Sequence, residues 1–161
     1  MPRKSTKEPL KTFYSDEYKF EIGIDEVGRG PMLGRVYTAA VILPKNDLFD
    51  HSQMKDSKRF SSKKKINEVA EYIKQNAIAY AVSYESEDII DKINILQATH
   101  SSMHKAVRTV LSNDIVDDDV LLLVDGNNFK PYMNFDKKSG LYSQINHQCI
   151  EGGDNKYTAI A

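Results

Sequence analysis

The sequence has very little cysteine: Cys149 is the single one among 161 residues, so no internal disulfide can form. One cysteine without a base beside it in the sequence is typical of an inert residue in a reducing compartment. Long hydrophobic runs are also missing, since none approaches the about 20 residues of a membrane span, and the polar, basic N-terminus lacks the apolar core of a signal peptide. We therefore expect a soluble, intracellular, cytoplasmic protein that contacts no membrane.

An excess of charge of either sign is absent too, because 22 Lys and Arg face 23 Asp and Glu, for a net charge of -1. Such a chain has no global attraction for nucleic acid and must hold a polyanion locally. Internal repeats and low-complexity tracts are also absent. The length and the 40% hydrophobic content suit one packed domain. We expect a monomeric domain over residues 19–161, preceded by a flexible or loosely docked tail over residues 1–18.

The stretch over residues 21–31, E-I-G-I-D-E-V-G-R-G-P, combines an apolar strand pattern with two adjacent carboxylates. Phe20, Ile22 and Ile24 alternate along one face, so Asp25 and Glu26 emerge where the strand ends. The next residues, Gly28, Arg29 and Gly30, form a loop in which the glycines let the backbone approach a ligand and the arginine adds a cation.

The remaining pattern predicts an α/β domain with a mixed sheet flanked by helices. Apolar alternation predicts strands over residues 36–43, 77–84 and 143–150, and a strand buried on both faces over residues 120–124. Apolar residues at helical spacing predict helices over residues 63–75, 86–93 and 95–111, with Asn94 as the N-cap of the last. We expect residues 129–142 to be irregular.

A second acid follows a second apolar strand, because residues 120–124 (V-L-L-L-V) run directly into Asp125 and Gly126. If the two strands are neighbours in one sheet, Asp25, Glu26 and Asp125 meet at the same edge. Carboxylates gathered without His or Cys favour Mg²⁺ or Mn²⁺ over zinc. Such a site suits the hydrolysis of phosphodiesters with two metal ions.

His100 and His104 stand at i and i+4 on a predicted helix, a spacing that is also compatible with a metal. No glutamate follows the first histidine and no third ligand is implied, so we expect an exposed helical face.

Five short motifs, in order, resemble those of the ribonuclease HII family, which cuts RNA in RNA–DNA duplexes. The motifs are G-I-D-E-V-G-R-G-P at residues 23–31, K-D-S-K at 55–58, I-N-I-L-Q-A-T at 93–99, V-D-G-N at 124–127 and G-D-N-K-Y at 153–157. The resemblance implies a ribonuclease-H-like fold. It also implies a metal-dependent endonuclease that hydrolyses the RNA strand of RNA–DNA hybrids, including ribonucleotides embedded in DNA, and leaves 5′-phosphate and 3′-hydroxyl ends.

The resemblance also assigns roles to individual residues. Asp25, Glu26 and Asp125 match the family's catalytic metal ligands, and Gly28, Arg29 and Gly30 match the loop that reads the ribonucleotide through its 2′-hydroxyl. Lys58 matches a lysine near the scissile backbone, and Lys156 is a weaker candidate for binding phosphate.

The chain departs from the family at its C-terminus. In the family the G-D-x-K turn leads into an alanine-rich helix that ends in a further, metal-binding aspartate, and a tyrosine that stacks on the substrate follows. The sequence stops at Ala161, so we expect a fragment or a truncated relative with three of four carboxylates. The competing hypothesis is a catalytically weak or inactive module that binds hybrids. An unrelated carboxylate-metal phosphohydrolase would leave the Gly-Arg-Gly loop and the D-S-K element unexplained.

Overall fold

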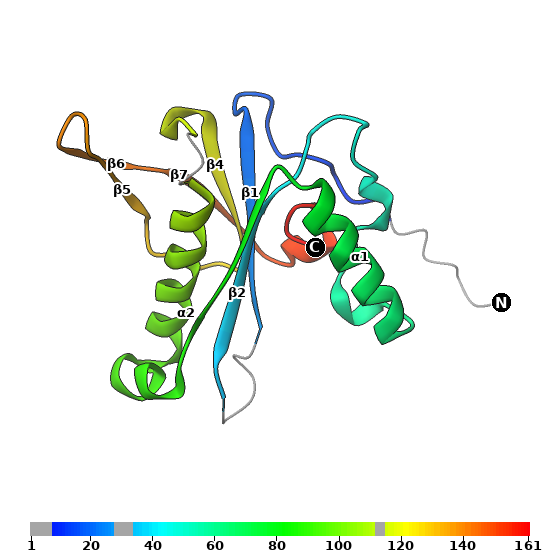
Figure 1. Ribbon diagram of the computed structural model, residues 1–161, viewed down its shortest axis with the longest axis horizontal. Helices are drawn as coiled ribbons and strands as arrows, with labels where there is room; N and C mark the ends of the chain where they lie inside the picture. The colour runs from blue at the N-terminus through cyan, green and yellow to red at the C-terminus, as the bar shows by residue number, and fades with distance from the viewer. Residues whose placement is uncertain (1–7, 28–33, 112–114) are drawn as a thin grey trace.

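A five-stranded mixed sheet forms the centre of the protein, with the strand order β3-β2-β1-β4-β7 (Figure 1). The computed structural model describes residues 8–27, 34–111 and 115–161. The strands are β1 (Phe20–Val27), β2 (Val36–Ile42), β3 (Ala79–Glu85), β4 (Val120–Asp125) and β7 (Asn146–Ile150). β2 pairs antiparallel with β1 and with β3, whereas β4 lies parallel to both β1 and β7. The predicted antiparallel pairing of the first two strands is confirmed.

The helices cover the two faces of this sheet. The long helix α2 (Glu87–Leu111) lies on one side, and α1 (Lys63–Asn76) lies on the other together with the C-terminal segment (Figure 1). Four short 3-10 helices connect these elements: η1 (His51–Gln53), η2 (Ser57–Arg59), η3 (Asp117–Asp119) and η4 (Gly153–Asn155). The Ser62 side chain accepts a hydrogen bond from the Lys65 N–H at 3.2 Å and thereby caps α1.

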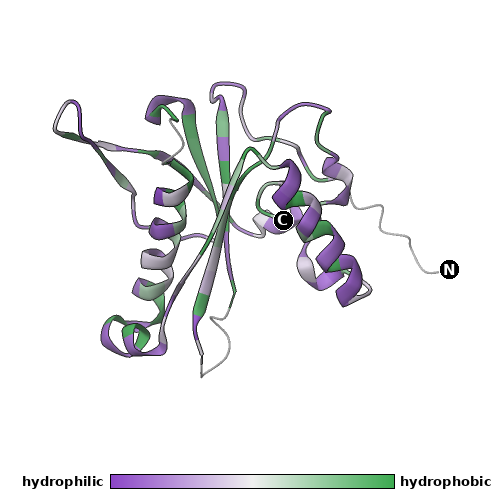
Figure 2. Cartoon of the chain, in the orientation of Figure 1, coloured by the Kyte–Doolittle hydropathy of each residue, from purple (hydrophilic) through white to green (hydrophobic). Residues whose placement is uncertain are grey.

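The main core lies between α2 and the sheet. Ile22 and Ile24 of β1 are fully buried against the inward face of α2, which contributes Met103 and Val107. Figure 2 shows the same division, with hydrophobic residues along the strands and hydrophilic residues on the outer surface of α1. All five residues of β4 from Val120 to Val124 are buried, as predicted for a strand covered on both faces.

Asn94 interrupts α2 with non-helical backbone angles, φ 68° and ψ 166°. Its side-chain oxygen accepts a hydrogen bond from the Gln97 N–H at 3.0 Å. The asparagine therefore caps the helix that continues to Leu111, and the predicted N-cap is confirmed.

The region after β4 differs from its predicted course. Residues 129–142 contain strand β5 (Met133–Asp136), which pairs with β6 (Leu141–Gln144) in a separate two-stranded sheet. The single strand predicted over residues 143–150 is divided at Ile145, whose N–H donates to the Tyr132 carbonyl at 3.0 Å and whose side chain is buried. This tertiary contact turns the chain from the hairpin into the main sheet.

The described part of the N-terminal arm is held against the domain. The buried Glu21 carboxylate accepts hydrogen bonds from the Tyr14 and Ser15 N–H groups, both at 2.8 Å. Further along the arm, the Lys11 N–H donates to the Lys156 carbonyl at 2.8 Å, and the Lys11 carbonyl accepts from the Thr158 N–H at 3.0 Å. These contacts hold the arm more firmly than its polar composition suggests.

The angles of Asn94 generate a prediction about stability. Replacing Asn94 with Ala removes the cap and keeps a Cβ in a region of φ and ψ that favours glycine, without the side-chain hydrogen bond that supports asparagine there, so the free energy of unfolding should fall by about 1–2 kcal/mol. Asn94→Gly loses the cap but suits the angles, so its cost should be about 0.5 kcal/mol or less. Denaturant unfolding of both variants measures this, and equal losses would contradict the prediction.

Candidate metal centre

Three neighbouring parallel strands each deliver an aspartate to the same edge of the sheet. Asp25 lies near the end of β1, Asp125 ends β4, and Asp154 lies in η4, directly after β7. β1 and β4 pair in the register Ile24 to Val124, so Asp25 and Asp125 follow side by side. One carboxylate oxygen from each aspartate lies within 4.8 Å of those of the other two. The geometry is that of a site for a cation with oxygen ligands.

Backbone N–H groups orient two of these carboxylates. The Gly153 N–H donates to Asp125 Oδ1 and the Glu26 N–H donates to Asp25 Oδ1, each at 2.7 Å. A Cβ at residue 153 would stand 2.5 Å from Ile160 Cδ1 and 3.3 Å from Asp125 Oδ1. A larger residue would require the Ile160 side chain to shift, so glycine suits the close approach of this segment to Asp125.

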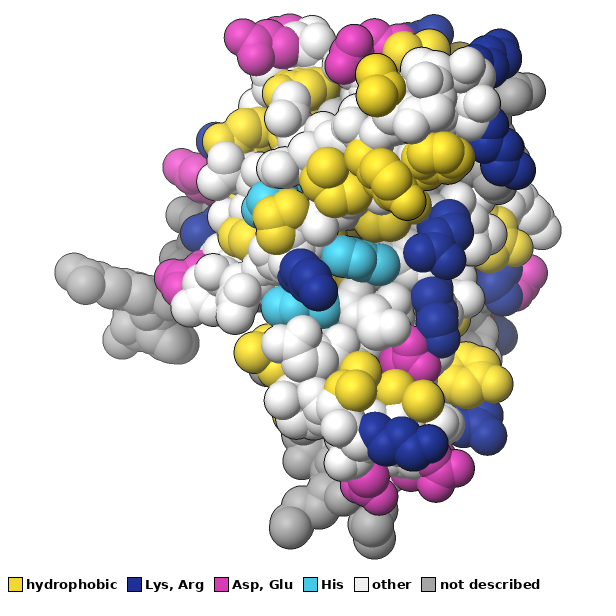
Figure 3. Space-filling view, turned by 90° about the vertical axis from the view of Figure 1, so that its left-hand side faces the viewer, with side chains coloured by type: hydrophobic (Ala, Val, Ile, Leu, Met, Phe, Trp, Pro, Cys, Tyr) yellow, Lys and Arg dark blue, Asp and Glu magenta, His cyan; other side chains and the backbone are white. Residues whose placement is uncertain are grey.

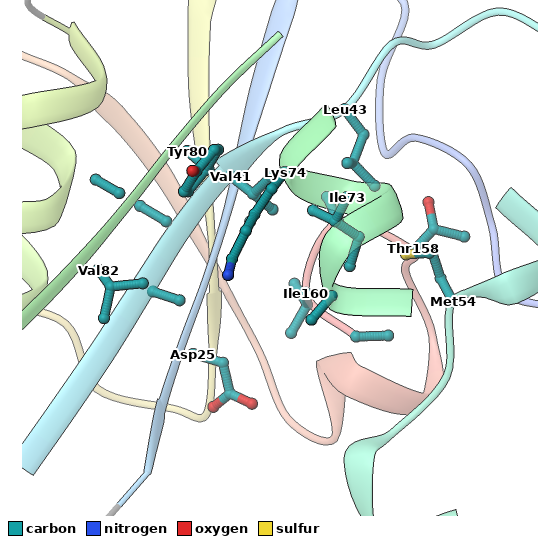
Figure 4. Close-up of a pocket in the computed structure, with 17 residues that line it drawn as sticks. Asp25, Val41, Leu43, Met54, Ile73, Lys74, Tyr80, Val82, Thr158 and Ile160 are labelled. Carbon is teal, nitrogen blue, oxygen red and sulfur yellow. The ribbon is translucent and has the colours of Figure 1, made fainter. Parts of the chain in front are cut away.

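Burial and the surrounding negative charges raise the pKa of Asp25 to about 7. Burial has the largest effect, since Asp25 lies at the end of an apolar cavity of about 250 Å³ whose lining includes Val82 and Ile160 (Figure 4). The carboxylates of Asp125, Glu26 and Asp154 raise the pKa further, while the hydrogen bond from the Glu26 N–H opposes them. A bound cation would remove this repulsion.

The aspartates open into a cleft of about 600 Å³. Its charged lining residues are Asp25, Glu26, Asp56, Lys58, Asp125 and Asp154. Lys58 belongs to η2, where the Asp56 carboxylate accepts a hydrogen bond from the Lys58 N–H at 3.0 Å. Among the described residues, Lys58 thus adds a cation to a cleft lined by carboxylates, which is an arrangement suited to a phosphate held by a metal ion.

The predicted site residues are placed as follows. The structure brings Asp25 and Asp125 together, and it puts Glu26 in the same cleft but outside the group of three aspartates. Adjacent residues of a strand point to opposite faces, so Glu26 cannot point in the same direction as Asp25. Lys58 lines the cleft, whereas Lys156 is exposed and does not line it. Gly28, Arg29 and Gly30 lie outside the described residues.

Asp154 is the member of the cluster that the motifs did not identify. The turn G-D-N-K-Y contributed only Lys156 to the predicted site, and the fourth carboxylate was expected beyond Ala161. The sequence signal that could have identified Asp154 is an acid shortly after a strand, the same arrangement that identified Asp25 and Asp125. The chain itself therefore supplies five carboxylates to the cleft, of which Asp25, Asp125 and Asp154 form the group of three.

The donor set fits a hard divalent cation. Three carboxylates without His or Cys match the oxygen ligands that Mg²⁺ and Mn²⁺ prefer. The raised pKa of Asp25 points in the same direction, because a group of acids that repel one another gains stability when a cation neutralises them.

The histidines of α2 have a different role. His100 is buried with only 6% of its surface exposed, so the predicted exposed helical face is wrong for this residue. Its ring centroid lies 6.2 Å from that of Phe129, and those of His104 and His147 lie 5.3 and 5.1 Å from it. Figure 3 shows histidines grouped on this face of the molecule. They pack around Phe129, and among the described residues they form no metal-binding group.

The fold and the acidic cleft define an α/β domain of ribonuclease-H-like type. The profile of ribonuclease HII matches residues 22–161. The chain is 42% identical to the ribonuclease HII of Cytophaga hutchinsonii over 152 residues, which cover 94% of this chain and 66% of that protein. It is 40% identical to the ribonuclease HII of Bacteroides fragilis, covering 91% of this chain and 64% of that protein. The chain belongs to the ribonuclease HII family and spans about two thirds of the length of these relatives.

Solved structures agree on the fold. The ribonuclease H2 of Pyrococcus horikoshii superposes with a TM-score of 0.66 at 17% identity, over 88% of this chain and 66% of that one. A ribonuclease HIII named Bst-RNase HIII, solved in complex with Mn²⁺, gives a TM-score of 0.57 at 13% identity, over 95% of this chain and 49% of that one. The ribonuclease-H-like fold is therefore confirmed.

Within the described part of the chain, no helix has both the length and the apolar character needed to cross a bilayer.

The raised pKa of Asp25 generates a prediction about stability in the absence of metal. The folded chain binds a proton at Asp25 up to about pH 7, whereas an unfolded chain releases it near the ordinary value of 3.8. Stability should therefore fall as the pH rises from about 4 to about 7. Asn at position 25 does not titrate, so Asp25→Asn abolishes this loss of stability. In EDTA at pH 8 the variant should therefore melt at a higher temperature than the parent, whereas at pH 4 the two melting temperatures should be nearly equal.

Thermal unfolding at the two pH values measures the difference, with Asp47→Asn as the control, because Asp47 is exposed and does not line the cleft. A stabilisation by Asp25→Asn that is the same at both pH values would contradict the assignment.

Proposed function

We propose that the chain is a ribonuclease H that depends on Mg²⁺ or Mn²⁺ and hydrolyses the RNA strand of RNA–DNA hybrids, including ribonucleotides embedded in DNA. The observation that carries the proposal is the group of Asp25, Asp125 and Asp154 at the ends of three parallel strands. Membership of the ribonuclease HII family supports the same reaction.

The residues of the cleft have distinct parts in this proposal. Asp25, Asp125 and Asp154 hold the divalent cation, and Glu26 adds a fourth carboxylate at the same cleft. A bound cation supplies an activated water and stabilises the leaving oxygen of the phosphodiester. Asp25 gives up its proton when the cation binds, because metal ligation requires the ionised carboxylate. The Lys58 side chain lines the cleft and neutralises the phosphate that enters it. The products of the reaction carry 5′-phosphate and 3′-hydroxyl ends.

The choice of RNA over DNA is assigned to Gly28, Arg29 and Gly30, which follow β1 directly in the sequence. Their match to the family's loop supports a contact with the 2′-hydroxyl, the group that distinguishes a ribonucleotide from a deoxyribonucleotide. This assignment rests on the sequence motif, since the three residues lie outside the described part.

A second candidate function is a hybrid-binding module with weak or no activity. Its support is that Glu26, which the resemblance assigns to the metal, stands outside the group of three aspartates. The five carboxylates in one cleft favour the enzyme, because a binding module gains nothing from carboxylates placed beside a phosphate backbone.

Cleavage of a duplex that contains a single ribonucleotide tests the proposal. With Mg²⁺ or Mn²⁺ the parent should cut at the ribonucleotide and leave an all-DNA duplex intact. Asp25→Asn, Asp125→Asn and Asp154→Asn should each lower the rate by roughly 100-fold or more, as expected when a main electrostatic contributor to the transition state is lost. The variant at Asp154 tests the structure most directly, because the motif that contains this residue assigned it no role.

Asp47→Asn is the matched control and should cut like the parent. Binding without cleavage by the parent would favour the module instead. Cleavage without preference for the ribonucleotide would overturn the proposal.

A further inference from the structure

Two tyrosines lie exposed on the sheet beside the acidic cleft. Tyr37 on β2 and Tyr84 on β3 are partners across the antiparallel strands, and their ring centroids lie 5.5 Å apart. Tyr37 is 39% exposed and Tyr84 is 46% exposed. Large aromatic side chains at this level of exposure offer apolar ring surface to a ligand.

An arginine completes the group. The Arg35 guanidinium carbon lies 4.8 Å from the ring centroid of Tyr84, within the range of a cation–π contact. Arg35 also approaches Glu87, with 3.9 Å from Nε to Oε2, but both side chains are about half exposed and the pair is weak. The guanidinium therefore keeps its capacity to bind an anion. We call Arg35, Tyr37 and Tyr84 the tyrosine platform.

The platform shares its face of the sheet with the metal site. Asp25 on β1 pairs with Ala39 on β2, and Tyr37 stands two residues from Ala39, so the strand alternation puts Asp25 and Tyr37 on the same side. Tyr37 also lines the cleft that contains the five carboxylates. A nucleic-acid strand with one phosphate at the metal site can therefore place a neighbouring nucleotide on the platform.

We propose that the tyrosine platform binds the apolar face of a nucleoside that flanks the cleaved phosphate, while Arg35 binds an adjacent phosphate. Aromatic rings combined with arginine hold nucleic-acid strands without regard to base sequence, which suits an enzyme that must act at any sequence. The proposal rests on the proposed function, since it extends the same cleft.

A third exposed tyrosine on the same face of the sheet, Tyr80, has different surroundings from those of the tyrosine platform. Tyr80 on β3 is also 46% exposed, but it lines the apolar cavity with Val82 and Ile160 and does not line the cleft. Figure 4 shows Tyr80 and Val82 in that cavity. Lys74 also lines that cavity, but its ammonium group is paired with Glu71 Oε1 at 2.9 Å. The platform combines ring surface with a cation that contacts the ring itself, which complements the charge of a nucleic acid and not that of an apolar segment of protein.

Binding measured in EDTA tests the platform without cleavage. Two ligands are compared, a blunt RNA–DNA hybrid and the same hybrid with a single-stranded overhang. Tyr37→Leu and Tyr84→Leu keep apolar volume but remove the stacking ring, and each should weaken binding roughly 5- to 100-fold, the range for loss of one stacked base. Tyr37→Phe and Tyr84→Phe should bind like the parent, and so should the matched control Tyr80→Leu.

Comparing the two ligands shows which part of the nucleic acid contacts the platform, an unpaired base or a sugar of the duplex. A loss confined to the overhang assigns the platform to an unpaired base, and an equal loss with both ligands assigns it to a sugar of the duplex. Binding by Tyr37→Leu and Tyr84→Leu that equals that of Tyr80→Leu would overturn the proposal, as would a parent that binds neither ligand.

The test is separate from that of the proposed function. If the parent binds the hybrid but never cuts it, the ribonuclease proposal fails while the loss of binding in the leucine variants still supports the platform. Thermal unfolding of each variant shows whether a loss of binding reflects a lost fold, and the phenylalanine variants confirm that the ring itself is the binding element.

Discussion

Electrostatic repulsion among carboxylates that the fold brings together is the constraint on which the site depends. Burial, and after it the charges of three neighbouring acids, raise the pKa of Asp25 to about 7. Like charges at this distance favour the protonated form or a bound cation. The fold withstands the repulsion because Asp25 and Asp125 stand on strands held by sheet hydrogen bonds and by the buried residues of β1 and β4. A bound cation would relieve the repulsion.

Strand register makes this arrangement possible. Ile22 and Ile24 are buried against α2, so the alternation of β1 sends Gly23 and Asp25 to the other face. A slip of one residue would expose the isoleucines and turn Asp25 toward the core, which the buried face forbids. The same alternation separates Glu26 from the group of three aspartates. The hydrophobic core therefore decides which acid of the Asp-Glu pair joins Asp125 and Asp154.

The face that carries Asp25 is closed on one side by the C-terminal segment and open on the other. A Cβ at Gly23 would stand 2.1 Å from the Ala159 carbonyl oxygen, so the segment packs directly on the backbone of β1. This close approach, with the Gly153 contact to Asp125, fixes the turn that carries Asp154. The open side contains the cleft, with Tyr37 near the start of β2 and Tyr84 near the end of β3.

Local patterns in the sequence determined most of the elements and part of the site. Alternation and helical spacing identified the main strands, α1 and the cap at Asn94, because each depends on neighbours within a few residues. The meeting of Asp25 and Asp125 was expected only on the condition that their strands are neighbours, and the parallel pairing of β1 and β4 meets that condition. Tertiary structure alone decided the break at Ile145, the burial of His100 and the entry of Asp154 into the cluster. Each of these depends on a contact between residues far apart in the chain, such as Ile145 with Tyr132 or Asp154 with Asp25, and no local pattern records which distant segments will meet.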